Sequence, residues 1–535
     1  MSSLPQRLAG LSQDWSHDPS AMPTARKFTL FGIMAFGQFM ALFDIQIVAG
    51  SLRDIQAGLS AGPDEISWVQ TAYLMAELVM IPLSGYLARA MSTRWLFAFS
   101  SGMFTLSSLL CGFAWNIESM IAFRTIQGFT GGAMVPLAFA VGFTIFSGPQ
   151  RALIPAILGT TAVLGPALGP TAGGLISDAL SWHWLFFVNV LPGIAITIAA
   201  IILIRVDRAA PALFLTIDWL HFFSMALFLG GLQFVLEEGP RHDWFGDTTI
   251  QIAAWLSFVG FVVFLERALF SPNPVVSLKP LLAPNFAFAC LFSLVIGFGL
   301  FASIYLVPIY LGRVRGFSSL QIGLTVYVVG IAQLVSTFIA ASLSQRVDMR
   351  WMITVGLLLF AWSNWITSHL TSEWGFWEMF WPQAVRGLSL MLCIVPSVNM
   401  ALAGVAPKDL GAASGLFNLM RNLGGAIGIA TVNTWLQDNT RIAALRFGET
   451  LGQARQEAGT ALDGLAARFS ATTPDPVIAQ EMARSEFAQV VGRQALTMAF
   501  DNVFLTICWM FLAALVLVPF CRQSGAAPAD TSAAH

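Results

Sequence analysis

The chain has 535 residues, of which 56% are hydrophobic and only 10% are charged, and its net charge is −2. Soluble domains carry about 25% charged residues, so the excess apolar surface must face lipid. The near-neutral charge gives no reason to expect a nucleic-acid partner. The six histidines form no ligand pair and no G-x-x-x-x-G-K-[ST] loop occurs, so we expect no metal, no cofactor, no ATP-driven step and no enzyme activity.

Membrane helices are predicted from apolar segments of about 20 residues, taken in chain order. After the polar residues 1–27, fourteen such segments follow: 28–50, 66–88, 95–114, 117–140, 152–176, 184–205, 218–236, 250–268, 286–308, 319–344, 352–370, 376–404, 409–435 and 497–520. The seventh and eighth are separated by the polar "EEGPRHDWFGD" (237–247). The sequence therefore predicts an all-α membrane protein that crosses the lipid bilayer many times.

The distribution of Lys and Arg predicts the orientation. With both termini in the cytoplasm, the inside segments hold fourteen of these residues and the short outside loops hold four. Cytoplasmic loops are enriched in Lys and Arg, so this bias favours an even number of spans with both ends inside. The pair Arg313 and Arg315, in an outside loop, is contrary to the rule.

An internal repeat divides the spans into two halves. "MSTRW" (91–95) follows the second span and "VDMRW" (347–351) follows the tenth, while "QGFTGGAMVP" (127–136) loosely resembles "GLSLMLCIVP" (387–396). The two offsets nearly agree, which predicts two six-helix halves with two helices inserted between them. The expected regions are a cytoplasmic tail 1–27, a first half 28–205, a linker with the two extra helices 206–285, a second half 286–520 that includes an outer loop 436–496, and a cytoplasmic tail 521–535.

Glycine and proline are concentrated in "LGPALGPTAGG" (164–174), inside the fifth span. Gly165, Gly169 and Gly173 recur every four residues and so form one stripe along a helix. Such a stripe lets a neighbouring backbone approach closely. The stripe indicates either a functional interface with a bent helix or general membrane packing.

The stretch "ALGPTAGGLISDALSWHWLFFVNVLPG" (167–193) resembles the fifth-helix motif of drug:proton antiporters in the major facilitator superfamily. The motif's Gly-Pro-x-x-Gly-Gly core corresponds to Gly169, Pro170, Gly173 and Gly174. The tail resembles the W-x-W-x-F-x-x-N-x-P signature of the fourteen-span, EmrB/QacA-type branch. The matching residues are Trp182, Trp184, Phe186 and Asn189, with Pro192 one place late.

The resemblance implies a major facilitator fold and a function. It implies proton-driven export of hydrophobic or amphipathic drugs and toxic compounds across the bacterial inner membrane by alternating access, and hence antibiotic resistance. The alternative is a dedicated exporter of one endogenous metabolite, lipid or siderophore on the same fold. Two positions depart from the family's loop after the second helix, because Arg89 stands where that loop has Asp and Ser92 stands where it has Gly.

Three ionisable residues lie deep in the first-half spans, where charges are costly and usually functional. Counted from the outer span ends, Asp44, Arg124 and Glu77 lie at depths of roughly 9, 11 and 16 Å. One interpretation is a proton-coupling site formed by Asp44, Glu77 and Arg124, in which the arginine tunes an acid. The other is a static Asp44–Arg124 ion pair that holds two helices together.

Four polar residues within the spans are candidates to line the substrate cavity: Gln38, Gln127, Asn418 and Arg421. The outer region 436–496 has helical periodicity, broken by "SATTPDPV" (470–477), and we expect two helical arms over the outer mouth. EmrB-like exporters of double-membraned bacteria work with a periplasmic membrane-fusion adaptor and an outer-membrane channel. The outer region is therefore either a docking surface for such an adaptor or a solvated cap without a partner.

Overall fold

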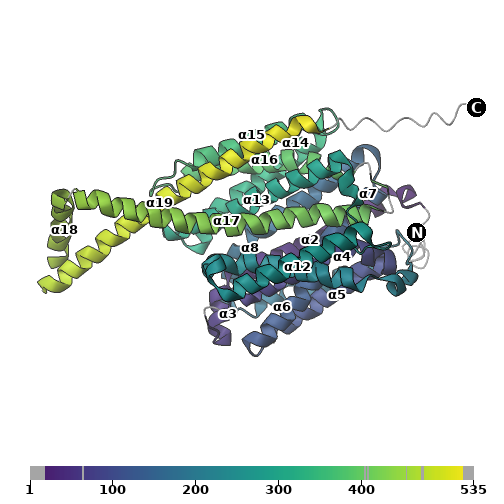
Figure 1. Cartoon of the computed structure of the whole chain (residues 1–535), viewed down its shortest axis with the longest axis horizontal. Coiled ribbons are helices and arrows are strands. Elements are labelled where there is room, and N and C mark those ends of the chain that lie inside the picture. Colours follow the sequence, from purple (N-terminus) through teal and green to yellow (C-terminus); the bar gives the residue numbers. More distant parts are fainter. Residues whose placement is uncertain are drawn as a thin grey trace, which may run out of the picture.

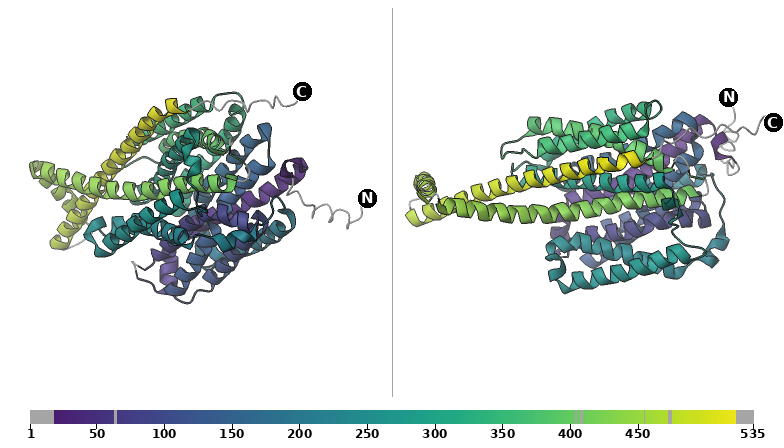
Figure 2. Two further views of the ribbon diagram at one scale, coloured as in Figure 1. Left: turned by 45° about the vertical axis from the view of Figure 1, so that its right-hand side comes forward. Right: turned by 45° about the horizontal axis from the view of Figure 1, so that its top comes forward.

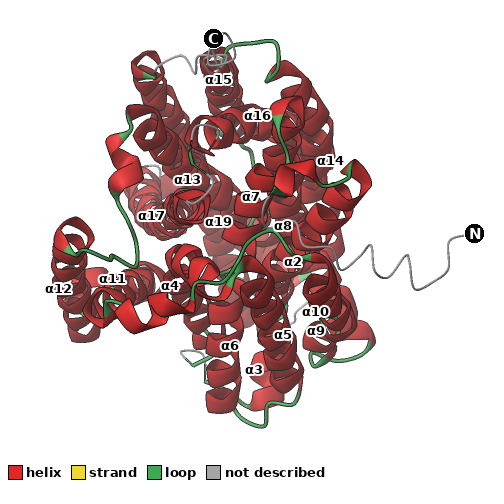
Figure 3. Ribbon diagram, turned by 90° about the vertical axis from the view of Figure 1, so that its right-hand side faces the viewer, coloured by secondary structure: helices red, strands yellow, loops and turns green. Residues whose placement is uncertain are grey.

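The computed structural model describes residues 18–521, apart from 63–64, 403–404, 407–408, 454 and 472–474. The predicted tails 1–27 and 521–535 thus lie mostly outside the described residues. The described residues form helices and turns with no strand among them (Figure 3). The all-α class expected from the sequence is therefore confirmed.

Each of the fourteen predicted segments coincides with a helix or a helix pair. The first six are α2 (Thr24–Gly50), α4 (Trp68–Met91), α5 (Thr93–Gly112), α6 and α7 (Ile117–Gly131 and Met134–Ile145), α8 (Leu153–Ala179), and α9 and α10 (Trp184–Phe187 and Val190–Leu203). The inserted pair is α11 (Trp219–Glu238) and α12 (Thr248–Phe270). The last six are α13 (Pro284–Arg313), α14 (Ser319–Leu343), α15 (Met349–Thr367), α16 (Phe376–Leu402), α17 (Leu410–Gln453) and α19 (Pro476–Ala514).

Among the described residues, eleven helices are long and apolar enough to cross a membrane. The helices α8, α15 and α17 match predicted spans in position but do not meet that criterion over their described residues. The count of fourteen spans therefore stays a prediction. One helix was not predicted at all: the short α3 (Leu52–Leu59), which directly follows α2.

Most described residues of the region 436–496 are helical, and they continue two of the spans. The helix α17 runs without interruption to Gln453, α18 spans Arg455–Ser470, and α19 begins at Pro476. The two long helices project away from the bundle and α18 joins them at the tip (Figures 1 and 2). The expected arms are thus direct extensions of two spans, because the helical periodicity of the sequence continues past the apolar stretch. We call this side of the bundle the arm end, and the opposite side, where α2 begins, the terminal end.

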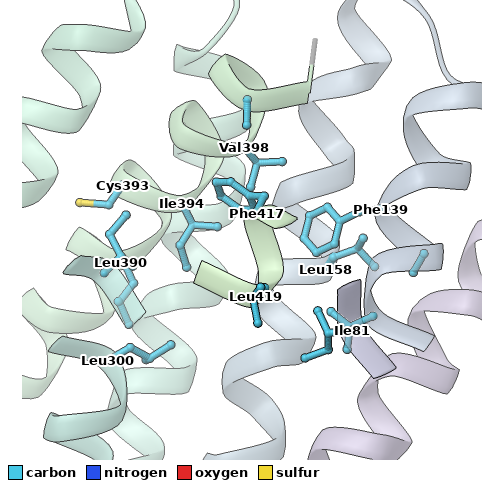
Figure 4. Packing of buried hydrophobic residues seen from close by; sticks show 14 of the residues in the cluster. Ile81, Phe139, Leu158, Leu300, Leu390, Cys393, Ile394, Val398, Phe417 and Leu419 are labelled. Atoms are coloured by element: carbon cyan, nitrogen blue, oxygen red, sulfur yellow. The ribbon is translucent and has the colours of Figure 1, made fainter. Parts of the chain in front are cut away.

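Two seams join the halves. The helix α8 packs on α14 and α4 packs on α17. In the first seam, the Thr160 and Thr337 hydroxyls are hydrogen-bonded at 2.7 Å, and the Gln333 amide donates to the Gly159 carbonyl at 3.0 Å. Apolar side chains from both halves meet between the seams, and Figure 4 shows Phe139 and Leu158 beside Phe417 and Ile394. The core is therefore continuous across the two halves.

The second seam is tight on the side of the terminal end. A Cβ atom on Gly85 of α4 would lie 2.7 Å from the backbone of Gly411 and Ala412, at the start of α17. The Ser414 hydroxyl donates to the Pro136 carbonyl at 3.0 Å, which links α17 to α7. Backbone thus meets backbone at this point of the seam.

Candidate functional site

Asp44 and Arg124 form a fully buried ion pair. Their side chains, on α2 and α6, are 0% exposed, and the Arg124 Nη1 lies 2.5 Å from the Asp44 Oδ2. Gln127, one turn along α6, donates from Nε2 to the Asp44 Oδ1 at 3.1 Å and accepts from Arg124 Nη1 at 2.8 Å. The three side chains therefore form one hydrogen-bonded network, in which the Arg124 Nη2 is buried without a partner among the described residues. The network contains both the acid and the arginine that the sequence placed at similar depths.

Arg124 is also held from α4. Its Nε donates to the Val69 carbonyl at 3.1 Å, and its guanidinium lies 4.3 Å from the centre of the Tyr73 ring. The close approach of α6 to α4 requires Gly128, because a Cβ atom there would lie 2.2 Å from the Tyr73 carbonyl oxygen. The guanidinium therefore has a defined orientation set by two helices, as expected for an arginine paired inside a membrane.

Asn189 completes the network, although the sequence analysis used it only as part of a signature. Its Nδ2 donates to the Asp44 Oδ1 at 2.6 Å and to the Ser108 hydroxyl at 3.2 Å. It lies at the break between α9 and α10, where the helix is interrupted for two residues. The signature residue thus joins α10 and α5 to the acid on α2. Its spacing from the tryptophans was the only signal in the sequence that could have indicated this role.

Glu77 lies apart from this network and faces a cavity. The cavity has a volume of about 90 Å³ and is lined by α2, α4, α8, α11, α13 and α17. Glu77 is 5% exposed, and within the described part of the chain its carboxylate has no hydrogen bond or ion pair. Because a water position needs roughly 10–15 Å³, the cavity has room for several waters next to Glu77. The second acid is thus positioned to exchange a proton or contact a ligand.

The four residues predicted to line the substrate cavity do not line this one. Gln38 donates to the Leu158 carbonyl at 2.7 Å and to the Thr161 hydroxyl at 2.9 Å, so it joins α2 to α8. Gln127 belongs to the Asp44 network. Asn418 accepts from the Arg421 Nη2 at 2.6 Å, and both are buried on α17. The polar residues that do line the cavity are Gln46, Gln70, Glu77, Gln233, Glu237 and Asn422.

The glycine stripe of α8 packs against α2 at the level of Asp44. A Cβ atom on Gly165 would lie 3.1 Å from the Leu42 backbone, and one on Gly169 would lie 2.4 Å from the Gln46 Cβ. A Cβ atom on Gly173 would lie 2.5 Å from the Ile47 carbonyl oxygen. The close approach expected of the stripe is therefore made with the helix that carries the buried acid.

The remaining motif residues are placed only in part. Gly174 lies on the same helix and is partly exposed. The backbone of Pro166 and Pro170 continues α8 without interruption, while their side chains lie outside the described residues. Whether the prolines bend the helix stays a prediction.

Asp207, in the linker that follows α10, contacts the turn between α4 and α5, and the sequence analysis did not single it out. The Asp207 carboxylate accepts from the Thr93 backbone N–H at 2.9 Å and from its hydroxyl at 2.7 Å, at the start of α5. Burial raises the pKa of Asp207, while the hydrogen bonds from Thr93 act in the opposite direction. Arg89, which replaces the family's Asp, lies with its guanidinium 5.6 Å from the centre of the Tyr86 ring. A carboxylate from the linker therefore caps α5 in this chain.

A model of the Major Facilitator Superfamily matches residues 34–429. A solved human structure, the organic anion transporter MFSD10 (TETRAN), superposes with a TM-score of 0.55 at 13% identity and covers 92% of this chain and 100% of its own. That likeness supports the fold alone. The chain belongs to the Major Facilitator Superfamily.

Curated relatives narrow the class further. The chain is 37% identical over 497 residues to the colistin resistance protein EmrB of Acinetobacter baumannii, covering 93% of this chain and 96% of that one. It is 27% identical over 506 residues to the multidrug export protein EmrB of Escherichia coli K12, covering 94% and 96%. The fatty acid resistance protein FarB of Neisseria gonorrhoeae is 28% identical over 414 residues, covering 77% and 81%. The chain is thus an EmrB-like member of the superfamily and a multi-pass inner-membrane protein.

Proposed function

We propose that the protein exports hydrophobic or amphipathic compounds by proton antiport through alternating access. The observation that carries the proposal is Glu77, a buried carboxylate that faces a cavity between the halves and has no partner among the described residues. An antiporter needs an acid that loses its proton when substrate binds and regains it from the other side. A proton that crosses 100 mV contributes about 2.3 kcal/mol toward that export.

The two acids then have different roles. Asp44 accepts hydrogen bonds from Arg124, Gln127 and Asn189 at once, so its negative charge is already stabilised. Asp44 does not line the cavity, so its proposed role is to hold α6 and the start of α10 against α2. Glu77 is the proposed proton carrier, because its carboxylate faces the cavity.

The antiporter motif would couple the carrier to movement of the halves. The helix α8 contacts α2 through the glycine stripe and contacts α14 of the other half through Thr160 and Gln333. Any rocking of the halves must therefore act on α2, which carries Asp44. In this way a change of conformation alters the surroundings of Arg124 and, through it, the charge balance near Glu77.

Proteoliposomes with an imposed pH gradient test the proposal. Gradient-driven efflux of a hydrophobic dye should be present in the wild type and lost in Glu77→Gln. Glu266→Gln, a matched change on the exposed face of α12 outside the cavity, should keep wild-type efflux. Efflux that survives in Glu77→Gln would refute the assignment of the carrier, and no efflux from folded wild type would refute antiport of such dyes.

A second candidate is a dedicated exporter of one amphiphile. The relative named a fatty acid resistance protein favours this alternative. Efflux of a single fatty acid, with no efflux of structurally unrelated dyes, would support it over multidrug export.

The arms are proposed as the docking surface for a periplasmic adaptor that leads to an outer-membrane channel. Large apolar side chains are exposed along them, including Leu445, Val477, Ile478 and Val490. Exposed apolar residues on a projecting element are typical of protein interaction sites. Aspartate substitutions at Leu445 and Val477 should abolish co-purification of the adaptor while dye efflux from proteoliposomes continues. Unchanged co-purification would leave the arms as a solvated cap.

A further inference from the structure

The inserted helix α11 forms part of the cavity wall. It packs on α4, with the rings of Trp68 and Phe234 stacked at 5.3 Å and Met75 against Gly230. Two of its residues, Gln233 and Glu237, line the cavity next to Glu77 of α4. The inserted helix α11 therefore contributes directly to the cavity.

Two adjacent acids on α11 have different surroundings. The Glu238 carboxylate accepts from the Thr71 hydroxyl at 2.9 Å and lies 3.8 Å from the Arg241 guanidinium and 3.9 Å from the His242 ring. Glu238 thus anchors α11 to α4. Glu237 instead lines the cavity, and within the described residues its carboxylate has no hydrogen bond or ion pair. Only Glu237 is free to act on a bound molecule.

The cavity lining is acidic and contains several side-chain amides. Its charged residues are Glu77 and Glu237, its amide residues are Gln46, Gln70, Gln233 and Asn422, and the other lining residues are apolar; no Lys or Arg is among them. Gln233 is 4% exposed and has no hydrogen bond to other described residues, so its amide is an unpartnered polar group that faces the cavity. This combination of acids, amides and apolar surface suits a molecule with a positive charge on an apolar body.

The two carboxylates lie at different depths. Gln70, next to the arm-end start of α4, and Glu237, next to the arm-end terminus of α11, mark the outer part of the cavity. Glu77 is seven residues further along α4, which is about 10 Å deeper at 1.5 Å per residue. A cation in the cavity therefore lies between Glu77 at the floor and Glu237 nearer the arm end.

We propose that the cavity binds amphipathic cations, and that Glu237 of α11 is a specificity residue that recognises their positive charge. This inference rests on the proposed function, because it takes the cavity around Glu77 as the substrate site. Glu237 holds the cation in the outer part of the cavity, Gln233 and the other amides contact its polar groups, and the apolar wall covers its body. Glu77 then releases its proton when the cation arrives beside it.

Equilibrium binding of tetraphenylphosphonium to the purified full-length protein in detergent tests the proposal without any gradient. At an effective dielectric constant of about 20, a unit charge roughly 12 Å away changes an affinity about tenfold. Glu237→Gln should therefore weaken tetraphenylphosphonium binding about tenfold or more. Glu237→Asp keeps the charge and should keep the affinity, and Glu266→Gln on α12 is the matched control, expected to bind as the wild type does.

Two results would overturn this inference, and a third would refute antiport alone. Wild-type affinity in Glu237→Gln would overturn the role of Glu237. Binding of dodecanoate by a wild-type protein that does not bind tetraphenylphosphonium would overturn the cationic class. Because binding needs no proton gradient, a protein that binds the cation but does not exchange it for protons would refute antiport while the inference on Glu237 stands.

Discussion

Removal of the Asp44 charge should destabilise the protein rather than only uncouple it. In Asp44→Asn the Arg124 guanidinium stays buried at 0% exposure but loses its counter-ion. Loss of one partner from a buried ion pair costs roughly 3–5 kcal/mol, because the other charge is left uncompensated. We expect the free energy of unfolding in mixed micelles to fall by about that amount. Arg124→Gln should cost a similar amount for the same reason.

The double variant Asp44→Asn with Arg124→Gln separates the pair from its surroundings. It removes both charges, so it should lose clearly less than the sum of the two single losses. Asp463→Asn on the exposed side of α18 is the control and should change the free energy of unfolding by no more than about 0.5 kcal/mol. Wild-type stability in Asp44→Asn, together with a loss of gradient-driven efflux, would refute this reasoning and make Asp44 the proton carrier.

Three further outcomes follow from local geometry. Ser92 has a φ of +72°, in a region of backbone conformation that disfavours residues with a side chain. Ser92→Gly should therefore raise the free energy of unfolding by about 1 kcal/mol, whereas Ser92→Ala should not raise it. Gly169→Ala should lower the free energy of unfolding by about 1–3 kcal/mol, because the added methyl group overlaps α2. Gly32→Ala on α2 is the control, and it should be neutral or stabilising because the space around Gly32 is open. Equal effects of the two substitutions would contradict the packing at the stripe. Backbone N–H groups of Thr249 and Ile250 lower the pKa of Asp247 at the start of α12, so its stabilising effect is present above the ordinary carboxyl pKa and lost as pH falls. The melting-temperature difference between wild type and Asp247→Ala should therefore shrink from pH 7 to pH 3, and a constant difference would exclude this cap.

The sequence predicted how deep a residue lies in its span, but not which neighbouring helix its side chain faces. Residue counts from the span ends placed Asp44 and Arg124 at similar depths, and the two side chains are paired. Gln127 and Glu77 were predicted to share a binding region, yet Gln127 bonds to Asp44 while Glu77 faces the cavity. Depth follows from a rise of 1.5 Å per residue, but the face that a side chain occupies depends on the rotation of each helix against its neighbours. In a chain with so many apolar residues, hydropathy gives little information about that rotation.

The contacts of two acidic residues could not be predicted from the sequence, for a related reason. The sequence places Glu237 in a polar connection between two spans, because "EEGPRHDWFGD" interrupts the apolar run. Only the packing of α11 on α4 brings it to the cavity. Asp207 similarly lies in a linker, and its contact with Thr93 joins residues more than a hundred positions apart. Such contacts depend on tertiary packing, which a single sequence does not record.

The position of the cavity favours one sequence of events for the proposed export. On the terminal side, Gly85 meets the backbone of α17, while the cavity with Glu77 and Glu237 lies toward the arm end. With the orientation that the Lys and Arg distribution predicts, the arm end faces the outside of the cell. Under the proposed antiport, a proton arriving from outside would then reach Glu77 and neutralise the carboxylate that had held a cation. One exchange at one site would therefore protonate Glu77 and release the cation outward.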